Sequence, residues 1–312
     1  MRLKYISGLM GFVVGDAMGV PLEFQSREEL LKKPVTKMIG YQTHNVPEGT
    51  WSDDTSMLIA TIDSINAKLT IDYDDIALKF VSWKYHADYT PYKEVFDIGN
   101  TCNAAISKYN EQRKDPLNCG LKDINSNGNG SLMRILPIAY YAVAKHLKDF
   151  EIIELVKNIS SITHAHPISQ MGCYIYVRFI MFLLNDKDKF SAYSMTKCVD
   201  YSMFGEEAEK AYARLLKDDI TKYKLKDINS TSYIVDTLEA TIWVSLKSEN
   251  YKEAIIGAIN LGEDTDTIAA LTGAVCGIIY GYDQIPEQWL EPIARREYLM
   301  DIFEEFSENK YQ

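Results

Sequence analysis

Long apolar runs, paired cysteines and flexible linkers are all missing from this sequence of 312 residues. The longest apolar run, Ile268–Tyr282, is too short and too glycine-rich for a comfortable membrane span, so no membrane partner is expected. The five cysteines form no C-x-x-C pair, which argues against a thiolate zinc site and favours buried thiols in a reducing compartment. No tract rich in proline, glycine or serine marks a linker. We therefore predict a single domain over residues 1–312, located in the cytoplasm.

Positive charge is also scarce. Lysine and arginine total 33 against 44 aspartates and glutamates, which gives a formal net charge of −11. Such a surface is unfavourable for broad binding to a nucleic-acid backbone, although a small phosphate ligand needs only a local pocket of donors. The sequence contains no long coiled-coil heptad and no obvious apolar stripe left for a partner, so we expect a monomer.

Alternation of apolar and polar residues with a period of two, the signal of a half-buried strand, is rare in this chain. Helical spacing, with apolar residues at i, i+3 and i+4, dominates instead, so we predict an all-α fold. The expected helices are Thr55–Lys68, Tyr73–Tyr89, Val95–Gln112, Leu132–Lys145, Phe150–Ser161, Ser169–Leu184, Glu206–Lys217, Tyr233–Leu246 and Tyr251–Ile259, with a last one from Glu287 towards Phe306. The polar segments 42–50, 115–130, 186–189 and 221–232 are expected to be loops.

Two further apolar segments carry small residues at a spacing of four. The first has Gly11, Gly15 and Gly19, and the second, which begins at Asp266, has Ala269, Gly273, Gly277 and Gly281. A glycine inside a helix costs about 1 kcal/mol relative to alanine, so several on one face indicate close contact between backbones. We expect two central helices, the second with its acidic N-terminus opening into a cleft.

Two acidic clusters are the most informative feature of the sequence. They are Ser52–Thr55, with the sequence Ser-Asp-Asp-Thr, and Glu263–Thr267, with the sequence Glu-Asp-Thr-Asp-Thr, and each precedes an apolar helix. Carboxylates and hydroxyl groups are the ligands that Mg²⁺ and Mn²⁺ prefer, and crowded acids need a compensating cation. The alternative is that both clusters only cap helices, because Ser, Thr and Asp are common caps and acids stabilise a first turn.

Three other segments offer polar groups for a ligand. The loop Asn127–Ser131 is rich in glycine and precedes a helix, so its N–H groups can surround a phosphate; the alternative is a plain Asn-Gly turn capped by Ser131. His164 and His166 follow a helix and are candidates for metal ligation, helix capping or a hydrogen bond to a ligand. Glu23, from its local sequence, could be only a surface acid.

Taken together, these segments resemble the ADP-ribosylglycohydrolase family, typified by dinitrogenase reductase-activating glycohydrolase and the mammalian ADP-ribosylhydrolases. The resemblance extends over nearly the whole chain, with its motifs in the family's order. The matching segments are Gly15–Gly19 followed by Pro21–Phe24, Trp51–Thr55, Gly128–Arg134, Thr163-His164 with His166-Pro167, Asp264–Thr267, and Ile285-Pro286 with Trp289.

The resemblance implies a compact orthogonal bundle of helices around a central cleft that holds two divalent cations, Mg²⁺ or Mn²⁺. The metal ligands it implies are Ser52, Asp53, Asp54, Asp264, Asp266 and Thr267. It implies catalytic roles for Glu23, Asp53, Asp54 and Asp264, with Glu23 on a mobile loop. It implies substrate contacts from Asn129, Gly130, Ser131, His164 and Tyr233. Two positions depart from the family: Ser52 replaces a common threonine, and Glu263 replaces a common glycine and adds an acid.

By this resemblance we expect a metal-dependent hydrolase that cleaves the glycosidic bond between ADP-ribose and a modified protein or small molecule. Arginine is the first expected acceptor, with serine and others open. One alternative is a catalytically silent ADP-ribose binder or a toxin-immunity protein of the same fold. Another is a dinuclear-metal phosphohydrolase, which would share the metal chemistry and release AMP or phosphate instead of ADP-ribose.

Overall fold

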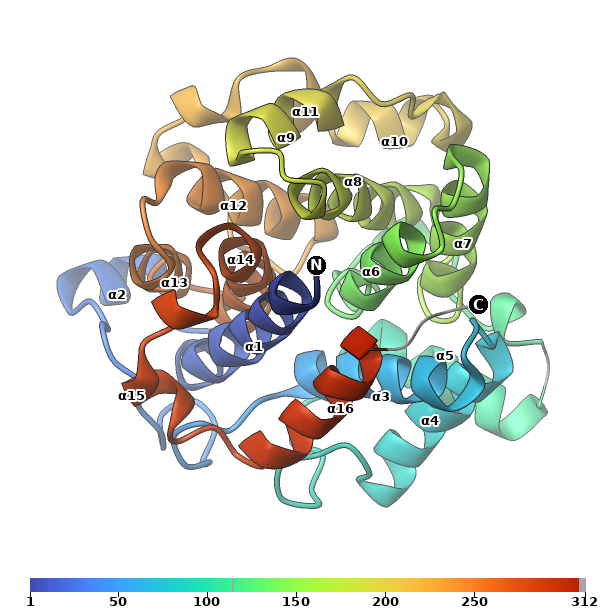
Figure 1. Cartoon of the computed structure of the whole chain (residues 1–312), viewed down its shortest axis with the longest axis horizontal. Helices are drawn as coiled ribbons and strands as arrows, with labels where there is room; N and C mark the ends of the chain where they lie inside the picture. The colour runs from blue at the N-terminus through green and yellow to red at the C-terminus, as the bar shows by residue number, and fades with distance from the viewer. Residues whose placement is uncertain (114, 309–312) are drawn as a thin grey trace.

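The computed structural model describes residues 1–113 and 115–308, and these residues fold into helices and loops (Figure 1). Within these two ranges the only β-type pairing consists of two isolated bridges, so the predicted all-α class is confirmed. The helices of the first half are α1 Arg2–Gly19, α2 Arg27–Lys32, α3 Asp53–Lys68, α4 Tyr73–His86, α5 Asn100–Gln112, α6 Leu136–Ala144 and α7 Asp149–Ser161. Those of the second half are α8 Pro167–Leu184, α9 Lys189–Lys197, α10 Glu206–Ala211, α11 Ala213–Lys217, α12 Ile234–Lys247, α13 Tyr251–Ile259, α14 Thr265–Tyr280, α15 Glu287–Leu290 and α16 Arg296–Glu308.

Two predicted helices begin later than the apolar spacing indicated. The segment predicted as Val95–Gln112 is helical only from Asn100, after Gly99 as N-cap, and residues 97–99 line the cavity described below. The segment predicted as Leu132–Lys145 becomes α-helical at Leu136. Proline at position 137 explains this, because a proline is favoured in the first turn of a helix and disfavours helix before it.

Other boundaries were wrong because local breaks and caps were overlooked. The predicted helix Glu206–Lys217 is two helices separated at Tyr212, and the predicted last helix is divided between α15 and α16. Helices α2 and α9 were missed. Both carry clear start signals, namely a capping box between Ser26 and Glu29, and Asp188, whose side chain accepts two backbone N–H groups.

Helices α1 and α14 lie side by side near the middle of the fold (Figure 1). A Cβ atom added at Gly11 would lie 2.3 Å from the carbonyl oxygen of Gly273, and one at Gly15 would lie 2.0 Å from that of Ala269. Only glycine fits at such distances. The predicted close packing of two central helices is therefore confirmed.

The remaining helices surround this pair. Helices α12 and α13 pack against α14, α16 lies against α1 and α3, and α8 contacts α6, α7 and α9. Two segments, Arg2–Leu22 and α8, are long and apolar enough to cross a membrane by length and composition, yet 100% and 78% of their apolar windows are buried inside the protein. In this fold both belong to the hydrophobic core.

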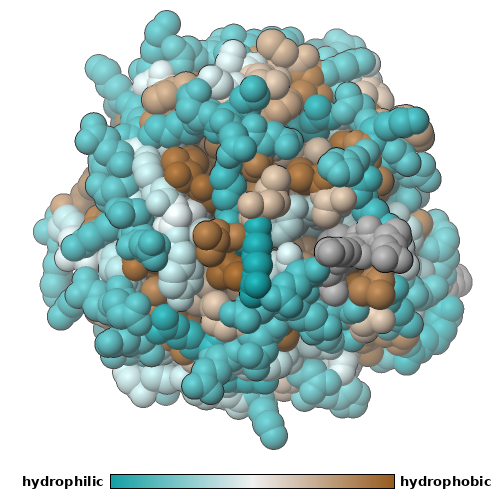
Figure 2. Space-filling model, viewed as in Figure 1, coloured by the Kyte–Doolittle hydropathy of each residue, from teal (hydrophilic) through white to brown (hydrophobic). Residues whose placement is uncertain are grey.

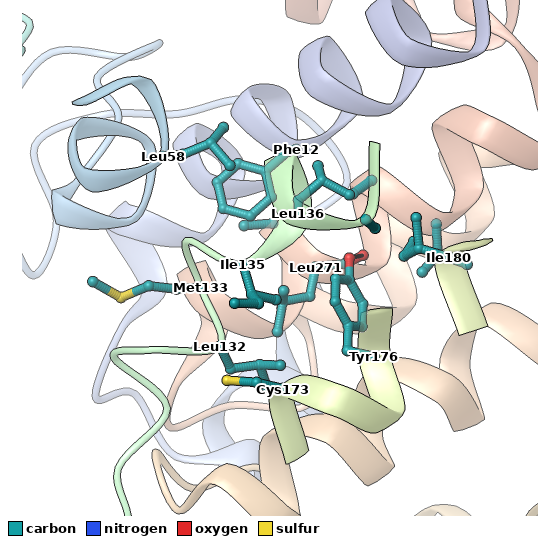
Figure 3. Close-up of a cluster of buried hydrophobic side chains, with 14 of the residues drawn as sticks. Phe12, Leu58, Leu132, Met133, Ile135, Leu136, Cys173, Tyr176, Ile180 and Leu271 are labelled. Atoms are coloured by element: carbon teal, nitrogen blue, oxygen red, sulfur yellow. Dashed lines mark hydrogen bonds between the residues drawn. The ribbon is translucent and has the colours of Figure 1, made fainter. Parts of the chain in front are cut away.

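The core reaches the segment that follows the glycine-rich loop. Leu132, Ile135 and Leu136 pack with side chains of α1, α8 and α14, and Met133, which is also buried, extends to the other side of this segment (Figure 3). Hydrophilic residues cover most of the face seen in Figure 2, with hydrophobic side chains visible between them. The glycine-rich loop is thus anchored by apolar residues directly after it.

Candidate metal centre and cavity

The first acidic cluster forms the N-terminus of α3. Ser52 is the N-cap, and its hydroxyl accepts the N–H of Asp54 over 3.2 Å, so the capping interpretation of this residue holds. It does not account for the aspartates. Asp53 and Asp54 are both buried, and Oδ2 of Asp54 has no hydrogen-bond partner among the described residues. An uncompensated buried carboxylate oxygen requires another partner.

The second cluster, at the N-terminus of α14, meets the first. Asp264, Asp266 and Thr267 are buried, and the hydroxyl of Thr267 lies 3.3 Å from Oδ1 of Asp54. The structure therefore brings together two clusters separated by 213 positions in the sequence. Glu263, by contrast, is exposed, so the extra acid that replaces a common glycine lies outside the cluster.

Helix α1 sets the positions of both clusters. Asp16, fully buried, accepts the backbone N–H of Ser52 at 3.0 Å and both the N–H and the hydroxyl of Thr55, at 3.1 and 2.6 Å. One turn further on, a Cβ atom at Gly19 would lie 2.3 Å from Cα of Asp266. Thus α1 holds the start of α3 with one residue and the start of α14 with another. The role of Asp16 was missed because its partners are distant in sequence.

Glu23 and Asp97 extend the acidic group. Carboxylate oxygens of Glu23, Asp97 and Asp266 lie within 4.8 Å of one another. Glu23 is also bonded to His44, with 2.6 Å between Oε2 and Nε2, and the His44 ring lies beside that of Phe96. Asp97 was missed because its segment was predicted to be helical. His44 gave no signal, since a single histidine in a polar loop is uninformative.

Crowding of these acids changes their protonation. Burial, followed by the charges of neighbouring carboxylates, raises the pKa of Asp53, Asp54 and Asp264 well above the usual range. The same two causes raise the pKa of Glu23 to about 12. Among the described residues no lysine or arginine forms an ion pair with the four aspartates of the two clusters. Carboxylate and hydroxyl oxygens, one of them without a partner, fit a hard divalent cation.

The glycine-rich loop lines the same cavity. Asn129 donates from its side-chain amide to Asp264 and to Thr237, the latter over 3.0 Å, and its backbone N–H donates to Ser232. Gly128 and Gly130 also line the cavity. Ser131 does not: its hydroxyl is buried between Ser160 and Cys173, at 3.0 and 3.3 Å. Any ligand contact of this loop therefore comes from residues 128–130.

The cavity has a volume of about 420 Å³, which is within the range of small-molecule sites. His164 is almost completely buried and lines it. Tyr233 is 38% exposed and lies next to the loop through a backbone bridge with Gly128, outside the cavity lining. His166 caps α8 by accepting the N–H of Ile168. Of the predicted site residues, the lining contains Glu23, Asp53, Asp54, Asn129, Gly130, His164, Asp264, Asp266 and Thr267.

Comparison with known proteins decides the family. Residues 2–312 match the model of the ADP-ribosylglycohydrolase family. The chain belongs to this family. It is 30% identical to an ADP-ribosylarginine hydrolase, Tri1, of Serratia proteamaculans, over 97% of this chain and 78% of that protein. It is also 30% identical to the ADP-ribosyl-[dinitrogen reductase] glycohydrolase of Rhodospirillum rubrum, over 93% of this chain and 90% of that protein.

The fold of this ADP-ribosylglycohydrolase family member also has a counterpart among solved structures. A chain of an ADP-ribosylglycohydrolase-related protein complex superposes with a TM-score of 0.81, at 22% identity, covering 99% of this chain and 98% of the other. That likeness concerns the fold. The family and the class of glycohydrolase enzyme expected from the sequence are confirmed.

Proposed function

We propose that this chain hydrolyses the bond between C1 of the distal ribose of ADP-ribose and the side chain of a modified arginine, and that it does so with two divalent cations. The observation that carries the proposal is the convergence of Asp53, Asp54, Asp264 and Asp266 on one cavity that is also lined by the Gly128–Gly130 loop. The carboxylates can bind cations, and backbone N–H groups of the loop can bind phosphates, so groups suited to both lie in the same cavity. The relative from Serratia is named an ADP-ribosylarginine hydrolase and the relative from Rhodospirillum a glycohydrolase, and both names agree with cleavage of a bond to ADP-ribose.

The residues that would hold the cations are the four aspartates together with Thr267 and Ser52. Ser52 does not line the main cavity, and its hydroxyl, which accepts the N–H of Asp54, would offer a remaining lone pair to a cation. Cations held there would offset the acidic charge, orient the ribose hydroxyl groups and make a water molecule more acidic. Asp54 has the clearest need for one, because its Oδ2 is buried without a partner.

Glu23 is the better candidate for the proton carrier. Both carboxylates form a hydrogen bond, but the partner of Asp264 is the amide of Asn129, whereas the partner of Glu23 is the imidazole of His44, a ring that can pass on a proton. Cations held by the neighbouring aspartates would offset the negative charges that help to raise the pKa of Glu23 and so favour its carboxylate form. In the proposed reaction this carboxylate takes a proton from water while the water oxygen bonds to C1. The C1–N bond breaks, its electron pair stays on the guanidine nitrogen, and that nitrogen receives the proton.

Arginine is favoured as the acceptor because the cavity carries two carboxylates beyond those of the two clusters, Glu23, which is proposed as the proton carrier, and Asp97. Asp97, on the segment before α5, lines the cavity and lies within 4.8 Å of Glu23 and Asp266. A guanidinium group pairs well with a carboxylate, which accepts two parallel N–H groups. A neutral serine acceptor would leave this carboxylate without such a partner.

The test is release of free ADP-ribose from peptides carrying ADP-ribose on arginine or on serine, with Mg²⁺, Mn²⁺ or EDTA. We expect metal-dependent release from the arginine peptide, loss of release in Asp54→Asn, and retention in the control Asp63→Asn. Asp63 lies on the same helix but pairs with Lys79 over 2.6 Å. Release only from the serine peptide would refute the assignment of arginine as the acceptor. AMP as the product would indicate a phosphohydrolase. Binding of ADP-ribose without any release would indicate a catalytically silent binder.

A further inference from the structure

A buried arginine lies behind the cavity wall without a carboxylate partner. Arg134 is 0% exposed and its guanidinium carbon lies 4.8 Å from the centre of the Phe80 ring. Its Nε and Nη1 atoms have no hydrogen-bond partner among the described residues. Burying a cation in this way is unfavourable, and burial lowers the pKa of Arg134 to about 10. Its remaining nitrogen, Nη2, is well bonded and indicates what the side chain does.

Nη2 of Arg134 connects to the cavity through one threonine. It donates to the hydroxyl of Thr163 over 2.8 Å and to the carbonyl oxygen of Ile159 over 3.1 Å. The same hydroxyl lies 2.9 Å from Nδ1 of His164. A chain of hydrogen bonds thus runs from a buried cation to a histidine that lines the cavity.

The hydroxyl proton of Thr163 has a preferred acceptor. Arg134 only donates, so the choice lies between Nδ1 of His164 and the thiol of Cys102, which also interacts with Thr163. An imidazole nitrogen accepts better than sulfur. The positive charge of Arg134 attracts a lone pair and repels an N–H group on the edge of the His164 ring that faces Arg134. Both effects favour Nδ1 of His164 as the acceptor, an arrangement in which the proton of the neutral ring is on Nε2.

The Nε2 edge of His164 faces the glycine-rich loop. Cβ atoms added at Gly128 and Gly130 would lie 3.7 and 3.6 Å from Nε2, and no described residue forms a hydrogen bond with it. The backbone of His164 is fixed on both sides, because its N–H donates to Ser160 over 2.7 Å and its carbonyl accepts the Ser160 hydroxyl over 2.8 Å. Burial, and then the charge of Arg134, lower the pKa of His164 to about 3, so the ring stays neutral.

We propose that Arg134 and Thr163 are positioning residues that fix His164 as its neutral Nε2–H tautomer, so that the imidazole donates a hydrogen bond to an anionic oxygen of the ligand at the Gly128–Gly130 loop. The opposite tautomer would present a lone pair to that oxygen and repel it. The identity of the ligand as ADP-ribose rests on the proposed function, whereas the tautomer is a property of the free protein.

The first test is nitrogen NMR of the free protein labelled with ¹⁵N-histidine. The chain has five histidines, and His164→Asn assigns the signal of interest by its disappearance. We expect a pyridine-type shift for Nδ1 and a pyrrole-type shift for Nε2 of His164. A wild-type spectrum with the proton on Nδ1 overturns the proposal. Because this experiment needs neither substrate nor turnover, its outcome is independent of the proposed function.

The second test measures ADP-ribose affinity by calorimetry in the presence of Mn²⁺. Thr163→Val should weaken binding about 10- to 100-fold, the usual worth of a hydrogen bond to a charged group, whereas Thr163→Ser should bind like the wild type. Arg134→Met should move part of the His164 population to the Nδ1–H tautomer and weaken binding about threefold to tenfold.

A His164→Ala background separates positioning from general damage. If Arg134 and Thr163 act through His164, both effects on affinity disappear there. Equal losses in the two backgrounds overturn the proposal. If Arg134→Met does not fold, Thr163→Val and Thr163→Ser decide, since valine has the same shape as threonine and serine keeps the hydroxyl.

Discussion

Replacing Gly19 by alanine should separate the two acidic clusters. The new Cβ would lie 2.3 Å from Cα of Asp266 and 2.4 Å from the carbonyl oxygen of Thr265, both backbone atoms that have no room to move alone. Ordinary contact begins near 3.4 Å, so α1 and the first turn of α14 must separate by about 1 Å. The distance between a metal ion and its ligand tolerates a change of only about 0.2 Å, so we expect the affinity for Mn²⁺ to fall about 100-fold. The clash should also lower the free energy of unfolding by about 1–3 kcal/mol.

Two other glycines provide matched controls for this variant. Gly11→Ala introduces a similar clash, 2.3 Å from the carbonyl oxygen of Gly273, two turns away from Gly19 on the same helix, and should lower stability while changing Mn²⁺ affinity much less. Gly257→Ala places a Cβ 3.4 Å from a Val244 methyl group, which is ordinary contact. It should leave the Mn²⁺ affinity unchanged and either leave the free energy of unfolding unchanged or raise it by up to about 1 kcal/mol. Calorimetric Mn²⁺ titration and urea unfolding give the two numbers. Wild-type Mn²⁺ affinity in Gly19→Ala would refute the reasoning.

Three further predictions concern individual acids and pH. Asp16→Asn should lower the free energy of unfolding by about 2–4 kcal/mol in urea, because Asp16 accepts hydrogen bonds from Ser52 and Thr55 at the start of α3; unchanged stability would contradict its positioning role. Glu23→Gln should lower kcat about 10²- to 10⁴-fold with ADP-ribose affinity retained, measured by turnover and calorimetry. Metal-free protein should lose stability as pH rises from about 5 to about 7.5, since folded carboxyl groups with raised pKa values, such as Asp16 at about 7, hold protons that the unfolded chain has released. Thermal unfolding in EDTA, and again after Mn²⁺ is restored, measures this change in stability. A melting temperature in EDTA that rises between about pH 5 and about pH 7.5 would contradict the prediction.

The sequence was sufficient for the fold class because helical spacing and the small-residue stripes depend on short-range order. Gly11, Gly15 and Gly19 on one helix and Gly273 on the other predicted the central contact that the structure shows. Helix ends were less predictable. The break before α16 and the late start of α6 depend on a proline or a turn that apolar spacing does not register.

For the site, motif residues were found and their supports were not. Asp54 and Asp266 stand in acidic clusters that are visible in the sequence, and the structure places both in the cavity. Asp16 and Asp97 stand in no such cluster, and their importance comes from contacts with residues far away in the sequence. Arg134 was part of a matching motif, but only the structure shows that it is buried and bonded towards His164 through Thr163.

The most direct test of the account is titration of EDTA-stripped protein with Mn²⁺ while following release of free ADP-ribose from an arginine-linked peptide. We predict no release without metal, and release that rises with bound Mn²⁺ and reaches its maximum near two ions per chain. Asp54→Asn should bind less metal and remain inactive throughout. Full release in EDTA, or AMP in place of ADP-ribose as the product, would contradict a metal-dependent glycohydrolase at this cavity.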